Sequence, residues 1–229
     1  IAQMAKALGK TTDYEDLMRR AKNYRYLYNP KTKLFQARNA DGCWAGEHSG
    51  FTEGANWTYQ FCVMQDVQGL IDLMGGNESF AAALDNVFDN GHYRHDNEPG
   101  HHYVYLYNYC GRFDKAQERI PEILDTHYRN GADGLSGNDD CGQMSAWYLF
   151  SSLGFYPVTP ASGEYALGIP RFPSARVELP HGKVLTVRAE GLKEHKHLPV
   201  ILFNGKKLDA PFIAIRDLMK GGVLEFKAE

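Results

Sequence analysis

The chain has 229 residues, of which 43% are hydrophobic, enough for a sizeable core in one domain or slightly more. Its formal net charge of −3 provides no basic surface for nucleic acid, and no apolar run approaches the length of a membrane-spanning helix. We therefore expect neither nucleic acid nor a membrane as a partner. The first residues, IAQMAKALGK, are typical of the end of a helix closed by Gly9. We expect the chain to be the C-terminal part of a longer polypeptide whose N-terminal domain is missing here.

Helical patterns alternate with loops up to about residue 155. Capping residues, apolar spacing and glycine stops predict helices over residues 11–28, 56–76, 77–91, 100–111, 112–128 and 141–155. Asn77 is the expected cap of the third, and Pro121 is expected to break or kink the fifth. Apolar and amphipathic helices alternate along the chain, as in a double-layered helical toroid. Half of a toroid built from six helical hairpins would have about the length of this chain.

The composition changes after residue 160. Segments 175–191, 198–210 and 221–229 alternate in β fashion and are joined by HGK and NGK turns. They predict a small antiparallel sheet that completes a β-sandwich with strands from the missing part. The expected fold is mainly α, with residues 1–160 forming the second half of the toroid and residues 161–229 the sandwich segment.

Three loops end in acidic residues and lead directly into apolar helices. They carry Glu53 in SGFTEGANW, Asp96 and Glu98 in YRHDNEPGHH, and Asp139 and Asp140 in SGNDDCGQ. Successive loops are about one helical hairpin apart, so in a toroid the three helix N-termini would point to the same end of the ring. We expect the three acidic clusters to converge there.

Several chemical roles suit converging carboxylates. The simplest is capping, since Asp and Asn satisfy the free N–H groups of a first helical turn. Carboxylates in a cleft also serve glycoside cleavage, in which one carboxylic acid protonates the leaving oxygen and one carboxylate activates water. Oxygen-rich loops with Asn and Glu suit a hard cation such as Ca²⁺.

These motifs resemble a known family. FTEGANW, HDNEPGHHYVYLYNY and GNDDCGQMSAWYLFSSLGFYPV are similar to the corresponding blocks of glycoside hydrolase family 92, the Ca²⁺-dependent exo-α-mannosidases. The tail, from YALGIPRFPSARVELPHGK onward, is similar to the same family's C-terminal strands. The resemblance covers nearly the whole chain in the same order. It implies an (α/α)6 barrel, an N-terminal β-sandwich domain, inversion at the anomeric carbon, and an extracellular or periplasmic location that no residue here demonstrates.

The resemblance also implies roles for the acids. Glu53 corresponds to the general acid and Asp140 to the general base, which activates water directly or through a relay. Here GNDD stands in place of GDED, so Asn138 occupies the position of a second, assisting acid, and Asp139 is the remaining candidate for that assistance.

The NEPGHH block implies metal and substrate contacts. Asn97 is the candidate Ca²⁺ ligand, and Glu98 is a candidate for either the ion or the sugar hydroxyls. The form HxNEPxHH resembles members that act on α-1,2 linkages. Further candidate substrate contacts, each with core packing as the alternative, are Trp44, Trp57, His95, His101 and His102. A zinc site is disfavoured because neighbouring helical residues such as His101 and His102 point to different sides.

We therefore expect a metal-assisted, inverting hydrolase of terminal α-linked mannose on glycans. One alternative is another toroid glycosidase, or a lyase acting on acidic sugars, although no Arg or Lys cluster lies near these loops to recognise a uronate. The other is a non-catalytic glycan-binding or structural fragment. Activity of the longer polypeptide discriminates between the enzyme and the binding protein.

Overall fold

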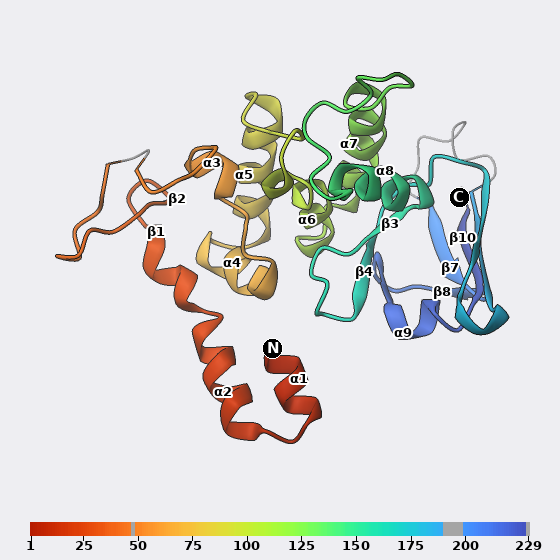
Figure 1. Cartoon of the computed structure of the whole chain (residues 1–229), viewed down its shortest axis with the longest axis horizontal. Helices are drawn as coiled ribbons and strands as arrows, with labels where there is room; N and C mark the ends of the chain where they lie inside the picture. The colour runs from red at the N-terminus through yellow and green to blue at the C-terminus, as the bar shows by residue number, and fades with distance from the viewer. Residues whose placement is uncertain (47–48, 190–198, 228–229) are drawn as a thin grey trace. The chain divides into compact units, whose positions relative to one another are not determined.

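The computed structural model describes residues 1–46, 49–189 and 199–227, drawn as ribbon in Figure 1. Residues 47–48, 190–198 and 228–229 lie outside this description, and with them the ends of the predicted strand segments 175–191, 198–210 and 221–229. The chain divides into two compact units, Ile1–Arg94 and His95–Glu229. Each unit is described separately.

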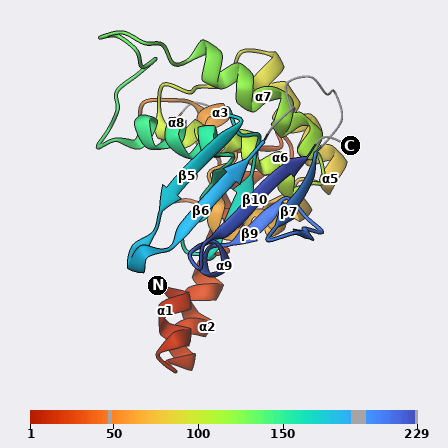
Figure 2. The same ribbon diagram turned by 90° about the vertical axis from the view of Figure 1, so that its right-hand side faces the viewer.

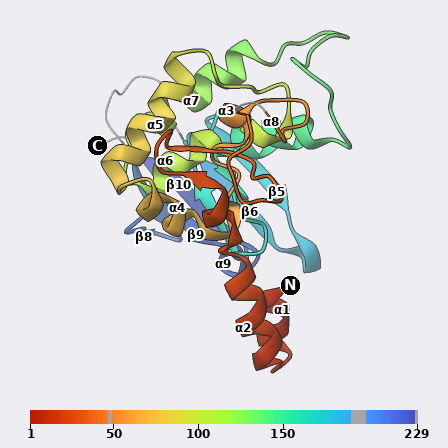
Figure 3. The ribbon, with the colours of Figure 1, turned by 90° about the vertical axis from the view of Figure 1, so that its left-hand side faces the viewer.

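The first unit is mostly helical. In chain order it contains α1 (Ala2–Ala7), α2 (Thr11–Arg20), η1 (Asn23–Leu27), β1 (Tyr28–Asn29), β2 (Leu34–Phe35), α3 (Asn56–Tyr59), η2 (Met64–Asp66), α4 (Val67–Leu73) and α5 (Asn77–Asp89). The helices α1 and α2 form a hairpin, which Figure 1 shows from the side and Figure 3 from another direction. The strands β1 and β2 form a two-stranded antiparallel ribbon. The core of the unit contains Phe61, Leu70, Ile71, Phe80, Leu84 and Val87.

Two predicted helices of this unit are shorter than their sequence patterns indicate. The helix expected over 11–28 ends at Arg20, and the chain continues as the 3-10 turn η1. The helix expected over 56–76 is interrupted between α3 and α4. The buried side chain of Gln60 explains the interruption, because its Oε1 accepts a hydrogen bond from the Phe35 N–H (3.0 Å) and its Nε2 donates to the carbonyl of Lys33 (3.1 Å). These contacts tie the end of α3 to β2.

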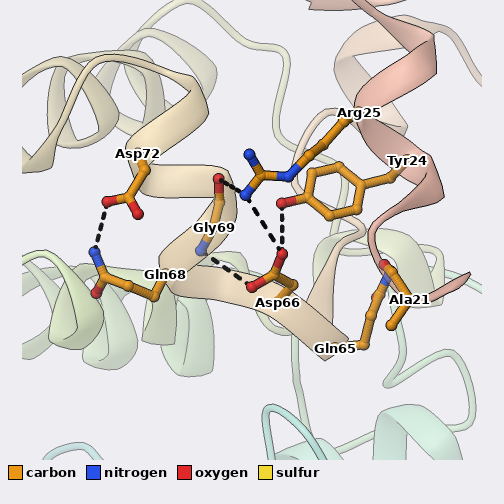
Figure 4. Close-up of polar contacts among 8 residues, drawn as sticks. All are labelled: Ala21, Tyr24, Arg25, Gln65, Asp66, Gln68, Gly69 and Asp72. Carbon is orange, nitrogen blue, oxygen red and sulfur yellow. Dashed lines mark hydrogen bonds and ion pairs between the residues drawn. The ribbon is translucent and has the colours of Figure 1, made fainter. Parts of the chain in front are cut away.

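After this interruption the chain becomes helical again at α4, which begins at a polar cluster around Asp66 (Figure 4). Asp66 is the N-cap of α4, and its carboxylate accepts hydrogen bonds from the Gly69 N–H (3.3 Å) and the Tyr24 hydroxyl (2.8 Å). The Arg25 guanidinium donates to the carbonyl of Gly69 (3.2 Å). The cluster joins η1 to α4. The next helix, α5, spans the predicted residues, but its N-cap is Gly76 rather than Asn77.

The second unit combines helices with two sheets. It contains η3 (Glu98–Gly100), η4 (Tyr103–Tyr105), α6 (Leu106–Tyr109), α7 (Phe113–Thr126), α8 (Gln143–Leu153), β3 (Phe155–Tyr156), β4 (Glu164–Leu167), β5 (Ser174–Glu178), η5 (Pro180–Gly182), β6 (Val184–Arg188), β7 (Val200–Phe203), β8 (Lys206–Lys207), β9 (Phe212–Ala214), α9 (Ile215–Leu218) and β10 (Gly222–Lys227). The helix predicted over 100–111 consists of η4 and the single turn α6. The predicted break at Pro121 does not occur, since α7 continues through it.

The larger sheet is mixed rather than antiparallel. Its strand order is β5-β6-β10-β7-β8, and the neighbouring strands β6 and β10 run parallel, as Figure 2 shows. The expectation of a purely antiparallel segment is wrong because β10 returns to pair between β6 and β7, a long-range pairing that local alternation does not encode. The NGK turn is confirmed. Asn204 and Gly205 both have positive φ (50° and 77°), as a tight two-residue hairpin turn between β7 and β8 requires.

Helices of the second unit share a core with this sheet. Leu185, Val187, Leu224 and Phe226 are buried on one face of the sheet, and Phe113, Phe150 and Leu153 from α7 and α8 pack against that core. Position 160, where the composition changes, therefore lies inside a compact unit. The predicted boundary between residues 1–160 and residues 161–229 refers to the domains of a longer polypeptide, so it stays a prediction. In the parts of the chain that the structure describes, no helix is both long and apolar enough to cross a membrane.

Candidate active site

Two of the three acidic loops lie against each other in the second unit. The loop before α8 approaches the loop before η3 at Gly137, where a Cβ atom would stand 2.2 Å from the carbonyl oxygen of Asp96. Only a glycine fits this approach. The loop carrying Asp139 and Asp140 is thereby packed on the loop carrying Asn97 and Glu98.

Hydrogen bonds from buried histidines reinforce this junction. The Nε2 of His101 bonds to the carbonyl of His95 (3.0 Å), so its Nδ1 is the acceptor for the Gln143 side chain at the start of α8 (3.3 Å). The carbonyl of His101 accepts from the indole N–H of Trp147 (2.8 Å). His95 reaches the same helix through Tyr128, whose hydroxyl lies 2.7 Å from the His95 Nε2 and donates to the carbonyl of Met144 (3.0 Å).

Burial keeps these imidazoles neutral. His95 is 1% exposed, and desolvation lowers its pKa to about 2, with the nearby His101 and His127 adding to the effect. Desolvation likewise lowers the pKa of His101. His102 is also buried and packs edge-on against Tyr103. The surroundings of these three histidines favour the core-packing alternative for each of them, and Trp147 beside them is fully buried.

The two adjacent acids have different surroundings. The carboxylate of Asp139 caps the first turn of α8, where its oxygens accept from the backbone N–H and the hydroxyl of Ser145 (2.9 and 3.0 Å). Asp140 is exposed and has a φ of 44°, followed by Cys141 at 61° and Gly142 at 90°. Asp140 and Cys141 are two successive non-glycine residues in the left-handed region, a conformation that costs free energy and clusters at functional sites. Capping therefore accounts for Asp139 but not for Asp140.

Asn97 and Glu98 supply oxygen atoms at the second loop. Both are half-buried, and the Asn97 Oδ1 accepts a hydrogen bond from the Glu98 N–H (3.0 Å), which fixes the turn into η3. Amide and carboxylate oxygens are the donor types that a hard cation prefers. Among the described residues, no three His, Cys, Asp or Glu side chains are grouped to hold a metal ion. The donor chemistry fits Ca²⁺ if water or substrate oxygens complete the shell.

The third acidic loop, which carries Glu53, belongs to the first unit. It is exposed and has a φ of 57°, so both predicted catalytic carboxylates stand at left-handed positions. The turn around Glu53 is anchored on its two sides. Thr58 Oγ1 accepts from the Ala55 N–H (3.1 Å), and the Tyr59 hydroxyl donates to the carbonyl of Thr52.

The two predicted sugar-stacking tryptophans contact neighbouring side chains. The Arg38 guanidinium lies 3.8 Å from the centre of the Trp44 ring, and Trp57 stacks on His92 at 4.6 Å with an angle of 6° between the rings. Both residues are half-buried. One face of each ring is thus covered by a partner within the unit.

A cavity of about 600 Å³ adjoins the Glu53 loop in the first unit. Aromatic and aliphatic groups form much of its wall, including Tyr24, Phe35, Phe51, Tyr59 and Val63. Two of its polar side chains have partners inside the unit: the Tyr24 hydroxyl donates to Asp66, and Arg38 donates to the carbonyls of Tyr26 and Gly42. The cavity therefore presents mainly ring and aliphatic surfaces.

Sequence reasoning missed Tyr128 and Gln143, which connect the two loops of the second unit. The only local signal for Gln143 was its position just after Gly142 at a helix start. Tyr128 gave none, because a tyrosine at the end of an amphipathic helix is ordinary.

Comparisons with known proteins identify the family of this chain. The glycosyl hydrolase family 92 catalytic domain matches residues 1–229. A protein of Arthroderma benhamiae described as an uncharacterized secreted glycosidase is 30% identical over 177 residues, which is 76% of this chain and 23% of that protein.

Solved structures similar to this chain belong to the same family. A family GH92 α-mannosidase of Bacteroides thetaiotaomicron is 40% identical with a TM-score of 0.91, over 99% of this chain and 32% of the other. A GH92 inverting mannosidase of the same species is 33% identical with a TM-score of 0.90, over 99% and 35%. The chain thus spans about a third of the length of these structures. It belongs to the catalytic domain of glycosyl hydrolase family 92.

Proposed function

We propose that the polypeptide carrying this chain hydrolyses terminal α-linked mannose from glycans, with α-1,2 linkages as the preferred substrate and inversion at the anomeric carbon. Family membership supports the reaction class, and the solved relatives are named as mannosidases, one of them inverting. The observation that carries the proposal is the packing of the Asp140 loop on the Asp96 loop at Gly137. This packing sets the loop that carries the exposed Asp140 against the loop that carries Asn97 and Glu98.

In this proposal Glu53 and Asp140 are the catalytic pair. Glu53 protonates the leaving glycosidic oxygen, and Asp140 removes a proton from the water that attacks the opposite face of the sugar. An inverting enzyme needs carboxyl groups about 6.5–9.5 Å apart, because the water stands between sugar and base. Asp139 assists by holding the turn that aims Asp140, and its capping contacts with Ser145 support that role.

Asn97 and Glu98 are the proposed Ca²⁺ ligands. Bound there, the ion supplies positive charge that draws sugar hydroxyls into place and favours ring distortion. The Asn97 side chain is held by its own turn, so its oxygen is fixed before the ion arrives. Glu98 is the residue whose carboxylate reaches either the ion or the sugar hydroxyls.

The remaining candidates complete the substrate site and the architecture. Trp44 and Trp57 each present an aromatic face to the sugar. His95, His101 and His102 do not contact the sugar but hold the loop of Asn97 and Glu98 in place. The 229 residues form the second half of an (α/α)6 barrel and the C-terminal strands of a sandwich. The relatives' greater length supports an N-terminal domain on the same polypeptide, and the secreted description of one relative supports export.

The test is hydrolysis of an α-1,2-linked mannobiose by the full-length polypeptide, alone, with EDTA, and after Ca²⁺ is restored. The proposal predicts mannose release that EDTA abolishes and Ca²⁺ restores. Activity unaffected by EDTA would remove the metal from the proposal. Binding of mannosides without release of mannose would favour a glycan-binding protein instead.

A further inference from the structure

Tyr128 occupies the point where three segments of the second unit meet. It follows α7 and begins the loop that carries Asp139 and Asp140. A bridge pairs it with Leu135 across the base of this loop, and the Arg129 N–H donates to the carbonyl of Gly134 (2.9 Å). Its ring stacks on Trp147 of α8, with centroids 5.8 Å apart and an angle of 4° between the planes.

The hydroxyl of Tyr128 joins the other two segments. Its single proton goes to the carbonyl of Met144 in the first turn of α8, so its oxygen accepts the Nε2 proton of His95. His95 is two residues before Asn97 and is packed between the rings of His101, His127 and Trp147. A single hydroxyl therefore bridges the loop of Asn97 and the helix that follows Asp140, alongside the contacts of His101 with Gln143 and Trp147.

We propose that Tyr128 is a positioning residue, whose hydroxyl sets the register between the loop of Asn97 and Glu98 and the turn of Asp140. The inference rests on the proposed function. Tyr128 acts through these residues and touches no substrate. Reacting groups tolerate little displacement, since a misplacement of about 1 Å costs about a hundredfold in rate.

The substitution Tyr128→Phe tests this role because it removes the hydroxyl and keeps the ring on Trp147. We expect kcat on mannobiose to fall about tenfold with KM changed less than about twofold, at a temperature where circular dichroism shows both proteins folded. Tyr148→Phe is the matched control. Tyr148 lies in α8 next to Trp147, and the centroid of its ring is 5.1 Å from that of Tyr128. We expect its kcat to equal that of the unsubstituted enzyme.

A double-mutant cycle separates positioning from general stability. If Tyr128 acts through Asp140, adding Tyr128→Phe to Asp140→Asn lowers the residual rate by less than about twofold. A full further tenfold loss in that background would overturn the inference, as would an unchanged kcat in Tyr128→Phe with only a lower Tm. Absence of mannose release from the unsubstituted protein would instead refute the proposed function on which the inference rests.

Discussion

Gly137 stands so close to Asp96 that a Cβ atom on the glycine would lie 2.2 Å from the carbonyl oxygen of the aspartate. This approach joins two loops that are about forty residues apart in the sequence. The backbone of Asp96 cannot yield as a flexible side chain would, so the contact fixes the distance between the loops.

Gly137→Ala should therefore impair both stability and activity. Relieving the overlap moves the loops apart, and we expect a loss of about 1–3 kcal/mol in unfolding free energy and of about tenfold or more in kcat. Gly131→Ala in the same loop is the control, because its Cβ would meet only the exposed carboxylate of Asp133 at 3.1 Å. Denaturant unfolding and mannobiose hydrolysis of both variants check the prediction. Equal behaviour of the two variants would contradict it.

The loss of activity caused by Glu53→Gln should depend on the leaving group. A general acid matters only when the leaving oxygen needs a proton, so we expect a loss of about 10²–10⁴ in kcat on mannobiose. The loss should be much smaller on an aryl α-mannoside whose phenolate departs unprotonated. Parallel kinetics on the two substrates measure the difference. A uniform loss would assign Glu53 to binding rather than to proton donation.

Substitutions of the adjacent acids should show that Asp140 is catalytic and that Asp139 is chiefly structural. Asp140→Asn should reduce kcat by about 10²–10⁴ on both substrates with little change in Tm, because Asp140 is exposed. Asp139→Ala removes a cap on α8 and should cost about 1 kcal/mol of stability while retaining more activity than Asp140→Asn. Thermal melts and initial rates on the same preparations test this ordering. The reverse ordering would make Asp139 the base.

Gly69→Ala should destabilise the first unit, although alanine is the better helix former by about 1 kcal/mol. A Cβ on Gly69 would stand 2.2 Å from the Asp66 Oδ2 and displace the carboxylate that caps α4 and binds Tyr24 (Figure 4). We expect a net loss of about 1–3 kcal/mol by denaturant unfolding. In an Asp66→Ala background the overlap is gone, so the same substitution should become neutral or stabilising there.

Stability should fall at high pH because buried tyrosines resist ionisation. Burial raises the pKa of Tyr156 to about 12, while the hydrogen bond from Gln143 opposes the rise. The unfolded chain, with an ordinary tyrosine pKa near 10, releases its proton first. The contribution of Tyr156 is thus complete below pH 10 and is lost between pH 10 and about 12, at about 1.4 kcal/mol per pH unit. Unfolding measured across this range in Tyr156→Phe should have a shallower slope, and an unchanged slope would refute the assignment.

Local patterns predicted the elements whose local and tertiary preferences agree. The helices α5, α7 and α8 and the Asn204–Gly205 turn are confirmed within a few residues. The pattern over 56–76 failed because Gln60 bonds to the backbone near β2, a contact with no periodic signal. Asp66 did carry a signal, as a capping residue inside an apolar run, and it marks the true start of α4.

The candidate site could be predicted only as residue types on loops. Acids before apolar helices, in motifs that resemble a family, pointed to Glu53, Asn97, Glu98 and Asp140. The link made by Tyr128 between His95 and Met144 could not be predicted, since it depends on which side chains meet in the folded unit. The capping contacts of Asp139 were anticipated as an alternative and are present.

The central claim is that Glu53 and Asp140 carry out inverting hydrolysis of α-mannosides, and the anomeric form of the first product tests it most directly. Proton NMR during hydrolysis of α-1,2-linked mannobiose by the full-length polypeptide would follow the released mannose before it equilibrates. The account predicts that β-mannose appears first and α-mannose later by mutarotation. Initial release of α-mannose, or no release at all, would contradict it.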